Sequence, residues 1–252
     1  MSSDNGSNTK FCENDPPLIG ILGGMGTAAG IHFQNLFFQV CNANGIHGDQ
    51  DYPEWLYFNA SKAPDRTEAL LGNGPSPEEY LVQRLQKMKA AGVDLVVAVC
   101  NTVHSFYTPV YGKVPIPWID LQDETARKIV HDGYTSVSLM STEGTLRSGL
   151  FRNAIASLQI DYHEPQPASE MQRMITNAIY HPGYGIKYTG AKVHPKALRM
   201  LQEVVDGFEV DAIIMGCTEL SLAKSHLKSN AVLLDPMEIA AQACYDYCYG
   251  KR

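Results

Sequence analysis

The sequence lacks the features that mark several large classes of protein. It has no apolar run near the roughly 20 residues that a membrane-spanning helix needs, and residues 1–16 contain no apolar segment typical of a secretory signal. Its net charge of −7 leaves no excess of the basic side chains that hold nucleic-acid phosphates. We therefore expect a cytoplasmic protein with no membrane and no nucleic-acid partner, and a disordered tail over residues 1–16.

Cysteine is scarce as well, and its spacing excludes two kinds of site. Six cysteines in 252 residues do not form a disulfide framework, and no C-x-x-C pair is present to hold a structural zinc ion. We expect a reducing compartment and no metal. Cys12 lies in the tail, Cys41 fits a helix face, and Cys244 and Cys248 lie four apart on one helical face, so we interpret these four as structural.

The other two cysteines occupy equivalent places in an internal repeat. Apolar segments over 93–99 and 210–216 end at Cys100 and Cys217, and in each segment an Asp stands six residues before the cysteine. A Gly-Thr pair opens each half at nearly the same distance from its cysteine. A duplicated half with one thiol each favours a single site between the halves. Two opposed thiols suit a reaction that removes a proton from one face of a carbon and returns one to the other.

Apolar segments alternate with amphipathic ones along most of the chain, which predicts an α/β fold with parallel sheets. Strands are expected at 17–22, 55–59, 94–99, 136–140, 211–215 and 231–234, and helices at about 28–44, 77–91, 145–157, 168–180, 194–207 and from 237 onward. Thr27 is expected to cap the first helix. We expect residues 17–115 plus 236–252 to form a first domain and 116–235 a second, so that the last helix returns to the first domain.

The positions of the two cysteines favour a reactive role. Cys100 and Cys217 follow predicted central strands, and ligands of open α/β sheets bind at those carboxyl ends. A helix N-terminus after each strand would lower the pKa of the thiol. A lone buried cysteine is ordinarily inert, but two at repeat-equivalent positions indicate chemistry. His104, one helical turn after Cys100, could tune that thiol or be a core histidine, and the sequence leaves both open.

The glycine loop before the first helix has two possible uses. Residues 24–29 match the loose form G-x-G-x-x-A of a dinucleotide-binding loop. That fingerprint also needs an acid at the end of the second strand, and here the strand over 55–59 ends in Asn59. Loop amides that hold a carboxylate therefore fit better.

Charged side chains near these motifs are open to two interpretations. Arg66 and Lys187 each lie in a Gly-, Pro- or Ser-containing loop, where either could be a solvated charge or a clamp for an anion. Glu219, two residues after Cys217, could orient a thiol or an ammonium group, or cap a helix. Asn101, Thr102 and other polar residues beside the cysteines could hold a substrate or cap helices.

Taken in order, these motifs resemble the cofactor-independent aspartate/glutamate racemase family over residues 18 to 240. The matching segments are Gly23-Gly24-Met25-Gly26, Pro64-Asp65-Arg66-Thr67, Cys100-Asn101-Thr102-Val103-His104 and Gly216-Cys217-Thr218-Glu219-Leu220. Thr27 is a departure, because many relatives carry Pro there. The resemblance implies two pseudo-symmetric Rossmann-like (flavodoxin-like) domains with an interdomain active site. It also implies that the two cysteines are the acid/base pair and that Arg66 and Lys187 contact the substrate's carboxylates.

The activity that this resemblance implies is racemisation of an acidic amino acid, aspartate, glutamate or both, without pyridoxal phosphate or another cofactor. The expected partner is the small amino-acid substrate, with a homodimer possible. A related isomerase or decarboxylase of a small carboxylate, or a non-catalytic carboxylate-binding protein, remains as an alternative, although two retained cysteines favour two-base racemisation. Beside the catalytic cysteines, the candidate substrate-binding residues are Met25, Gly26, Asn59, Arg66, Asn101, Thr102, Thr142, Lys187, Thr218 and Glu219.

Overall fold

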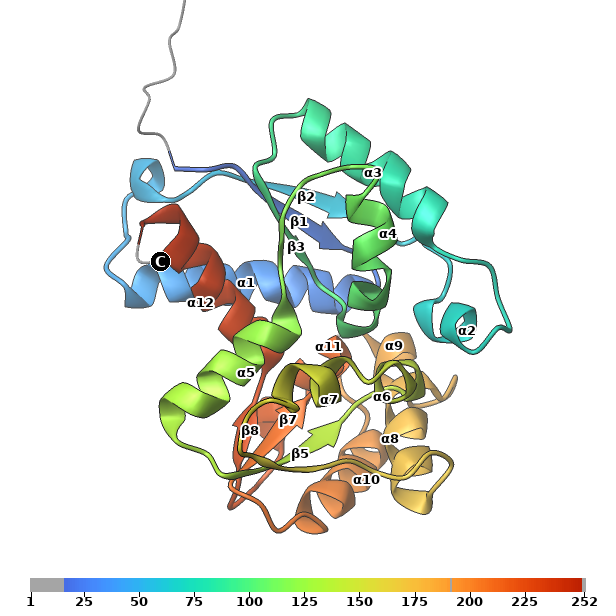
Figure 1. The fold of residues 1–252 in the computed structure, drawn as a ribbon. Coiled ribbons are helices and arrows are strands. Elements are labelled where there is room, and N and C mark those ends of the chain that lie inside the picture. The colour runs from blue at the N-terminus through green and yellow to red at the C-terminus, as the bar shows by residue number, and fades with distance from the viewer. Residues whose placement is uncertain (1–15, 191, 251–252) are drawn as a thin grey trace, which may run out of the picture.

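The computed structural model describes residues 16–190 and 192–250, so nearly all of the expected tail lies outside the described residues. Two four-stranded parallel sheets lie one above the other in Figure 1, with strand orders β2-β1-β3-β4 and β6-β5-β7-β8. The strands are β1 (Ile19–Gly23), β2 (Trp55–Asn59), β3 (Leu95–Ala98), β4 (Trp118–Ile119), β5 (Ser136–Met140), β6 (Asp161–His163), β7 (Ala212–Met215) and β8 (Val232–Leu234). The same strand order in both halves confirms the predicted α/β fold of two pseudo-symmetric Rossmann-like units.

Helices cover both sheets and connect their strands. They are α1 (Thr27–Ala43), α2 (Arg66–Leu70), α3 (Glu78–Ala90), α4 (Tyr107–Tyr111), α5 (Leu121–Asp132), α6 (Glu143–Ser148), α7 (Leu150–Ile155), α8 (Glu170–Tyr180), α9 (Ile186–Thr189), α10 (Pro195–Asp206), α11 (Thr218–Ser221) and α12 (Pro236–Cys248). Short 3₁₀ turns occur at Asp49–Asp51, Asn101–Phe106 and Lys224–His226. Within the described ranges, none of these helices is long and apolar enough to span a bilayer.

Several local expectations are wrong. Arg66 and Lys187, both expected in loops, lie in the short helices α2 and α9. The helix expected over 145–157 is divided into α6 and α7, because Gly149 takes the left-handed conformation (φ 67°) that ends a helix. Thr27 does not cap α1; Gly26 occupies the N-cap without a side-chain bond, and Thr27 is the first helical residue. The short strands β4 and β6 were not expected as strands, since two or three residues carry too little periodicity to be recognised.

The Asp of each repeat has a structural task. Asp94 accepts a hydrogen bond from the backbone N–H of Leu18 at 2.9 Å, just before β1. Asp211 accepts from the N–H groups of Thr135 (2.8 Å) and Ser136 (3.0 Å) at the start of β5. The bonds from Thr135 and Ser136 lower the pKa of Asp211 to about 2. Each Asp thus fastens the cysteine-bearing strand to the central strand beside it.

The two helices that follow β4 and β8 each pack on the opposite half. Ala126 and Ile129 of α5 lie in the core under the second sheet, whereas Met237 and Ala240 of α12 lie in the core under the first. Because β4 pairs with β3, the first sheet extends three to four residues beyond the expected division after residue 115. We propose a division into 16–119 plus 236–250, and 121–235.

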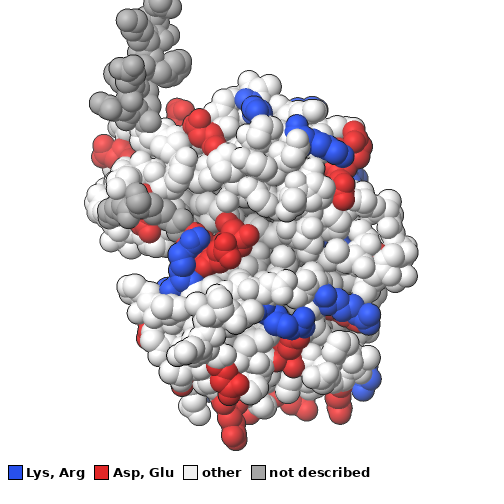
Figure 2. Space-filling model, in the orientation of Figure 1, with Lys and Arg blue, Asp and Glu red and all other residues white. Residues whose placement is uncertain are grey.

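The described cysteines outside the repeat are buried with the apolar core, whereas Cys12 lies outside the described residues. Cys41, Cys244 and Cys248 all lie in the core cluster between α1, α12 and the first sheet. On the surface shown in Figure 2, basic and acidic side chains are interspersed, and no continuous basic patch forms on that face.

Candidate active site

The two repeat cysteines line one small cavity between the halves. Each cysteine is 6% exposed and follows the carboxyl end of its strand, Cys100 after β3 and Cys217 after β7. Each also occupies the N-cap position of the turn that follows, as the repeat predicts. The lining residues are Met25, Arg66, Thr67, Cys100, Asn101 and Thr102 from the first half, and Thr142, Tyr180, Lys187, Cys217, Thr218 and Glu219 from the second.

All candidate substrate-binding residues except Gly26 and Asn59 line this cavity. Gly26 lies at its edge, where a Cβ atom would displace Glu219 Oε1. Asn59 lies at the end of β2, and its Oδ1 would clash with a Cβ on Gly24, whose φ is +87°. The structure therefore places Asn59 behind the glycine loop rather than in the cavity.

Two lining residues, Thr67 and Tyr180, were not expected from the sequence. Thr67 closes the Pro-Asp-Arg-Thr segment, so its place beside Arg66 was the available signal. Tyr180 is the last residue of α8, where no motif marks it. Burial of its ring raises the pKa of Tyr180, and Lys187 Nζ lies 5.4 Å from the ring centroid.

In the second half, an ion pair controls the thiol. The Cys217 thiol donates a hydrogen bond to Glu219 Oε2 at 3.0 Å, and Lys187 Nζ lies 2.6 Å from Glu219 Oε1. Burial, and then the charge of Glu219, raise the pKa of Cys217 well above its usual range, against the opposing effect of Lys187. Burial alone would raise the pKa of Glu219, but Lys187 more than offsets it and the pKa falls. Cys217 is therefore held as a thiol beside a carboxylate.

In the first half, a buried arginine lies near the other thiol. Arg66 is 7% exposed, and it donates to the carbonyl oxygens of Met25 (2.7 Å) and Pro64 (3.0 Å). Its Nε is buried without a partner. Burial lowers the pKa of Arg66, but the neighbouring Cys100 and Asp65 outweigh that effect and the net shift is upward. The cation thus stays charged beside Cys100.

The two cations meet at one oxygen. Lys187 Nζ donates to the Met25 carbonyl at 3.4 Å, the same oxygen that accepts from Arg66. This point on the glycine loop is therefore electropositive, with one cation supplied by each half. A carboxylate oxygen close to it would be stabilised by both charges.

Polar groups without charge complete the cavity. Thr102 Oγ1 lies 3.2 Å from Thr142 Oγ1 and 2.7 Å from Thr145 Oγ1, which joins the halves through hydroxyl groups. Asn101 Oδ1 accepts from Gln122 at 3.0 Å, and Asn101 Nδ2 is buried without a partner. An unpartnered buried amide N–H is costly unless a ligand accepts from it.

His104 does not line this cavity. Its ring packs edge-on against Trp118, with centroids 5.7 Å apart, and burial lowers its pKa although Asp120 acts in the opposite direction. It is a neutral buried histidine on the other side of the turn, so the interpretation that it tunes Cys100 gains no support.

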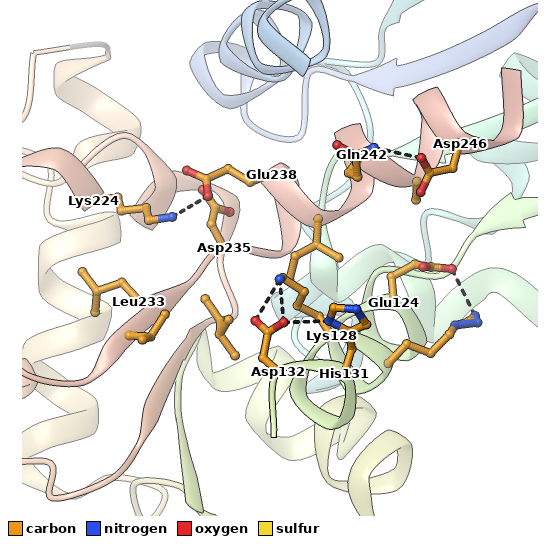
Figure 3. A pocket seen from close by; sticks show the side chains of 15 residues that line it. Glu124, Lys128, His131, Asp132, Lys224, Leu233, Asp235, Glu238, Gln242 and Asp246 are labelled. Carbon is orange, nitrogen blue, oxygen red and sulfur yellow. Dashed lines mark hydrogen bonds and ion pairs between the residues drawn. The ribbon is translucent and has the colours of Figure 1, made fainter. Parts of the chain in front are cut away.

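A larger hollow, open to solvent, lies between α5, β8 and α12 (Figure 3). Ion pairs such as Lys128–Asp132 (2.8 Å) and Lys224–Glu238 surround it. No cysteine is among its lining residues within the described chain. Size alone therefore does not locate the chemistry.

Comparison with known proteins agrees with the site. A family model described as Asp/Glu/Hydantoin racemase matches residues 22–244. The broad specificity amino-acid racemase RacX of Bacillus subtilis is 24% identical over 235 residues, which cover 90% of this chain and 96% of that protein. A glutamate racemase of Picosynechococcus is 28% identical over 178 residues, which cover 67% of this chain and 60% of that protein.

Solved structures give the same result. Picrophilus torridus aspartate racemase superposes with a TM-score of 0.77 at 25% identity, covering 92% of this chain and 94% of that one. Glutamate racemase from Francisella tularensis, in complex with D-glutamate, shares the fold with a TM-score of 0.62 at 16% identity, over 94% and 82% of the two chains. The chain belongs to the Asp/Glu/hydantoin racemase family and is an enzyme of the isomerase class.

Proposed function

We propose that this enzyme racemises an acidic amino acid, aspartate or glutamate, without pyridoxal phosphate, by proton transfer at the α-carbon between Cys100 and Cys217. The observation that carries the proposal is that the two repeat-equivalent cysteines line one small cavity with a cation from each half. A matched relative named as an aspartate racemase and others named as glutamate racemases support the acidic substrate.

The polar groups of the cavity suit the fixed parts of such a substrate. The unpartnered Asn101 Nδ2 and the hydroxyls of Thr102 and Thr142 can donate to the α-carboxylate. Arg66 and Lys187 converge from opposite halves and suit the side-chain carboxylate. Arginine holds a carboxylate bidentately, so it fixes orientation as well as charge.

The proton transfer needs one thiolate and one thiol. The hydrogen bond to Glu219 keeps the proton on Cys217, and Cys100 lies beside the Arg66 cation. In one direction the Cys100 thiolate takes the α-proton, the C–H electron pair stays on the α-carbon and its carboxylate, and Cys217 delivers its proton to the opposite face. The return direction exchanges the roles of the two cysteines. A small, buried cavity strengthens the donors that stabilise the carbanion.

Exchange of the α-proton with D₂O tests this mechanism. We expect Cys100→Ala and Cys217→Ala each to abolish racemisation and to retain slow exchange on one enantiomer only, opposite for the two variants. Cys248→Ala, a buried cysteine in the first core, is the control and should racemise normally. Near-wild-type racemisation by either single variant would exclude the two-cysteine mechanism.

The homodimer expected from the resemblance stays a prediction, which light scattering on the purified chain would check.

A further inference from the structure

One aromatic side chain forms part of the wall beside the two cations. We call the cavity lined by Cys100 and Cys217 the thiol cavity. Tyr180, the last residue of α8, lines it together with Arg66 and Lys187, and it is the one aromatic side chain among the described lining residues. Tyr180 therefore lies at the end of the thiol cavity where the side-chain carboxylate of the proposed substrate would bind.

The ring of Tyr180 holds the cation of its own half. Lys187 Nζ lies 5.4 Å from the ring centroid, within the range of a cation–π contact. The turn between α8 and α9 brings the two together, because the Gly185 N–H donates to the His181 carbonyl at 2.6 Å and a Cβ on Gly185 would clash with the His181 backbone. The ring and the 2.6 Å ion pair with Glu219 together fix the position of the Lys187 ammonium group.

The hydroxyl of Tyr180 contacts the opposite half. A hydrogen bond joins it to Thr67 of α2, the residue after Arg66. Gly144 of α6 closes on the same residue, since a Cβ there would clash with Thr67 Oγ1 and Cα. In Figure 1, α2 faces α6, α8 and α9 across the boundary between the halves. The second half thus fixes the backbone from which the Arg66 side chain extends.

Tyr180 therefore acts on both cations without adding a charge. It is near enough to Arg66 and Lys187 to affect the pKa of each, and burial raises its own pKa, so the phenol stays neutral. The two cations converge on the Met25 carbonyl oxygen. With the cations and the ring fixed together, the distance from the thiols to the carboxylate-binding groups is fixed as well.

We propose that Tyr180 is a positioning residue that sets the length of the substrate, so that the enzyme prefers aspartate to glutamate. The inference rests on the proposed function and decides between its two substrates. With the α-carbon between the thiols, the shorter side chain of aspartate brings its carboxylate to the two cations. The additional methylene of glutamate would push the carboxylate against the ring. One methylene in a filled pocket changes kcat/KM by about tenfold or more.

Pairs of ligands that differ by one methylene test the proposal. The measurements are kcat/KM for aspartate and glutamate, and dissociation constants from titration calorimetry for succinate and glutarate. We expect the wild-type enzyme to prefer the shorter member of each pair by about tenfold or more. Tyr180→Leu removes the ring and should move both ratios about tenfold toward the longer member.

The possible results separate this inference from the proposed function. A wild-type enzyme that prefers glutamate would refute the inference and leave the proposed function standing. Equal effects of Tyr180→Leu on both lengths would refute it as well. If neither amino acid is racemised, the proposed function fails, and equal binding of succinate and glutarate would then refute the length limit separately.

Two further variants separate positioning from a loss of stability. Tyr180→Phe keeps the ring and removes the bond to Thr67, so KM for aspartate should rise with kcat and the preference for aspartate nearly unchanged. This variant also serves if Tyr180→Leu does not fold; a KM equal to that of the wild-type enzyme would refute the positioning of Arg66. Tyr162→Leu is the matched control, since Tyr162 is a partly buried tyrosine of the second half that donates to Glu164 at 2.8 Å and does not line the thiol cavity. It should leave the preference unchanged, and a shift equal to that of Tyr180→Leu would contradict the proposal.

Discussion

Glu219→Gln isolates the effect of one charge on the acid thiol. The carboxylate accepts from the Cys217 thiol at 3.0 Å and pairs with Lys187 at 2.6 Å. Glutamine has the same shape and can still accept a hydrogen bond, but it carries no charge. Burial and the Glu219 charge both raise the pKa of Cys217, and Lys187 lowers it. The variant removes one raising influence and leaves the lowering one uncompensated, so the pKa of Cys217 must fall.

The size of the effect follows from the kind of bond that is lost. A hydrogen bond to a charged group contributes about 1.5–3 kcal/mol, so the Cys217 thiolate becomes a weaker base, and removal of the α-proton by Cys217 should slow by up to roughly 10- to 150-fold. Proton removal from the other enantiomer, by Cys100, should be affected less. Breaking a buried ion pair costs about 3–5 kcal/mol of stability when the partner stays charged. Lys187→Met combined with Glu219→Gln should recover part of that loss.

Two assays report on this variant. Absorbance of the thiolate near 240 nm, followed against pH in a Cys100→Ala background, measures the pKa of Cys217, with Lys187→Met as the opposite perturbation. Initial exchange rates from the two pure enantiomers measure the directional asymmetry. If the pKa of Cys217 is unchanged or higher in Glu219→Gln, or if both directions slow equally, Glu219 does not hold the proton on Cys217 and the assignment of the resting acid is wrong.

Two further predictions concern Arg66 and Asp235. Arg66→Lys and Arg66→Ala should each lower kcat/KM for aspartate and glutamate, with a loss of about 2–4 kcal/mol in transition-state stabilisation. Lysine is a point charge and does not replace the two-bonded contact of a buried guanidinium with a carboxylate. A nearly unchanged kcat/KM in Arg66→Ala would remove the basis for an acidic substrate. Burial raises the pKa of Asp235 to about 6, although its bonds from Ser221 and Met237 act in the opposite direction. Because the pKa of Asp235 is higher in the folded state than its unfolded value near 4, Asp235 stabilises the fold at a pH below 4. That stabilisation is lost as the pH rises through 6. Asp235→Asn should therefore raise the free energy of unfolding at pH 7 by up to about 3 kcal/mol and give no gain at pH 4. Urea unfolding curves at pH 4 and pH 7 would measure the difference. An equal gain in stability at the two pH values would contradict the argument from charge.

The sequence by itself determined the elements that depend on local pattern. Continuous apolar segments specified β3 and β7, because a strand buried on both faces needs them, and the repeat of these segments predicted two equivalent sheets. Cys100 and Cys217 follow the carboxyl ends of strands in two different sheets, where ligands of α/β sheets bind. Their equivalent positions in the repeat predicted that both thiols reach one cavity between the halves. The paired Asp residues entered only as markers of the repeat, although their bonds explain why they recur.

The tertiary structure alone decided what depends on atoms brought together from distant segments. Tyr180 and Thr67 carry no signal that links them, and they meet only when α8 of one half closes on α2 of the other. The sequence of the glycine loop does not indicate that Arg66 and Lys187 share the Met25 carbonyl oxygen. Asn59 was expected in the site because the direction of a side chain at the end of a strand cannot be inferred from the alternation of residues along it. The proton on Cys217 depends on burial and on the 2.6 Å Lys187–Glu219 pair, and electrostatic energies of this kind follow distance and dielectric rather than sequence spacing.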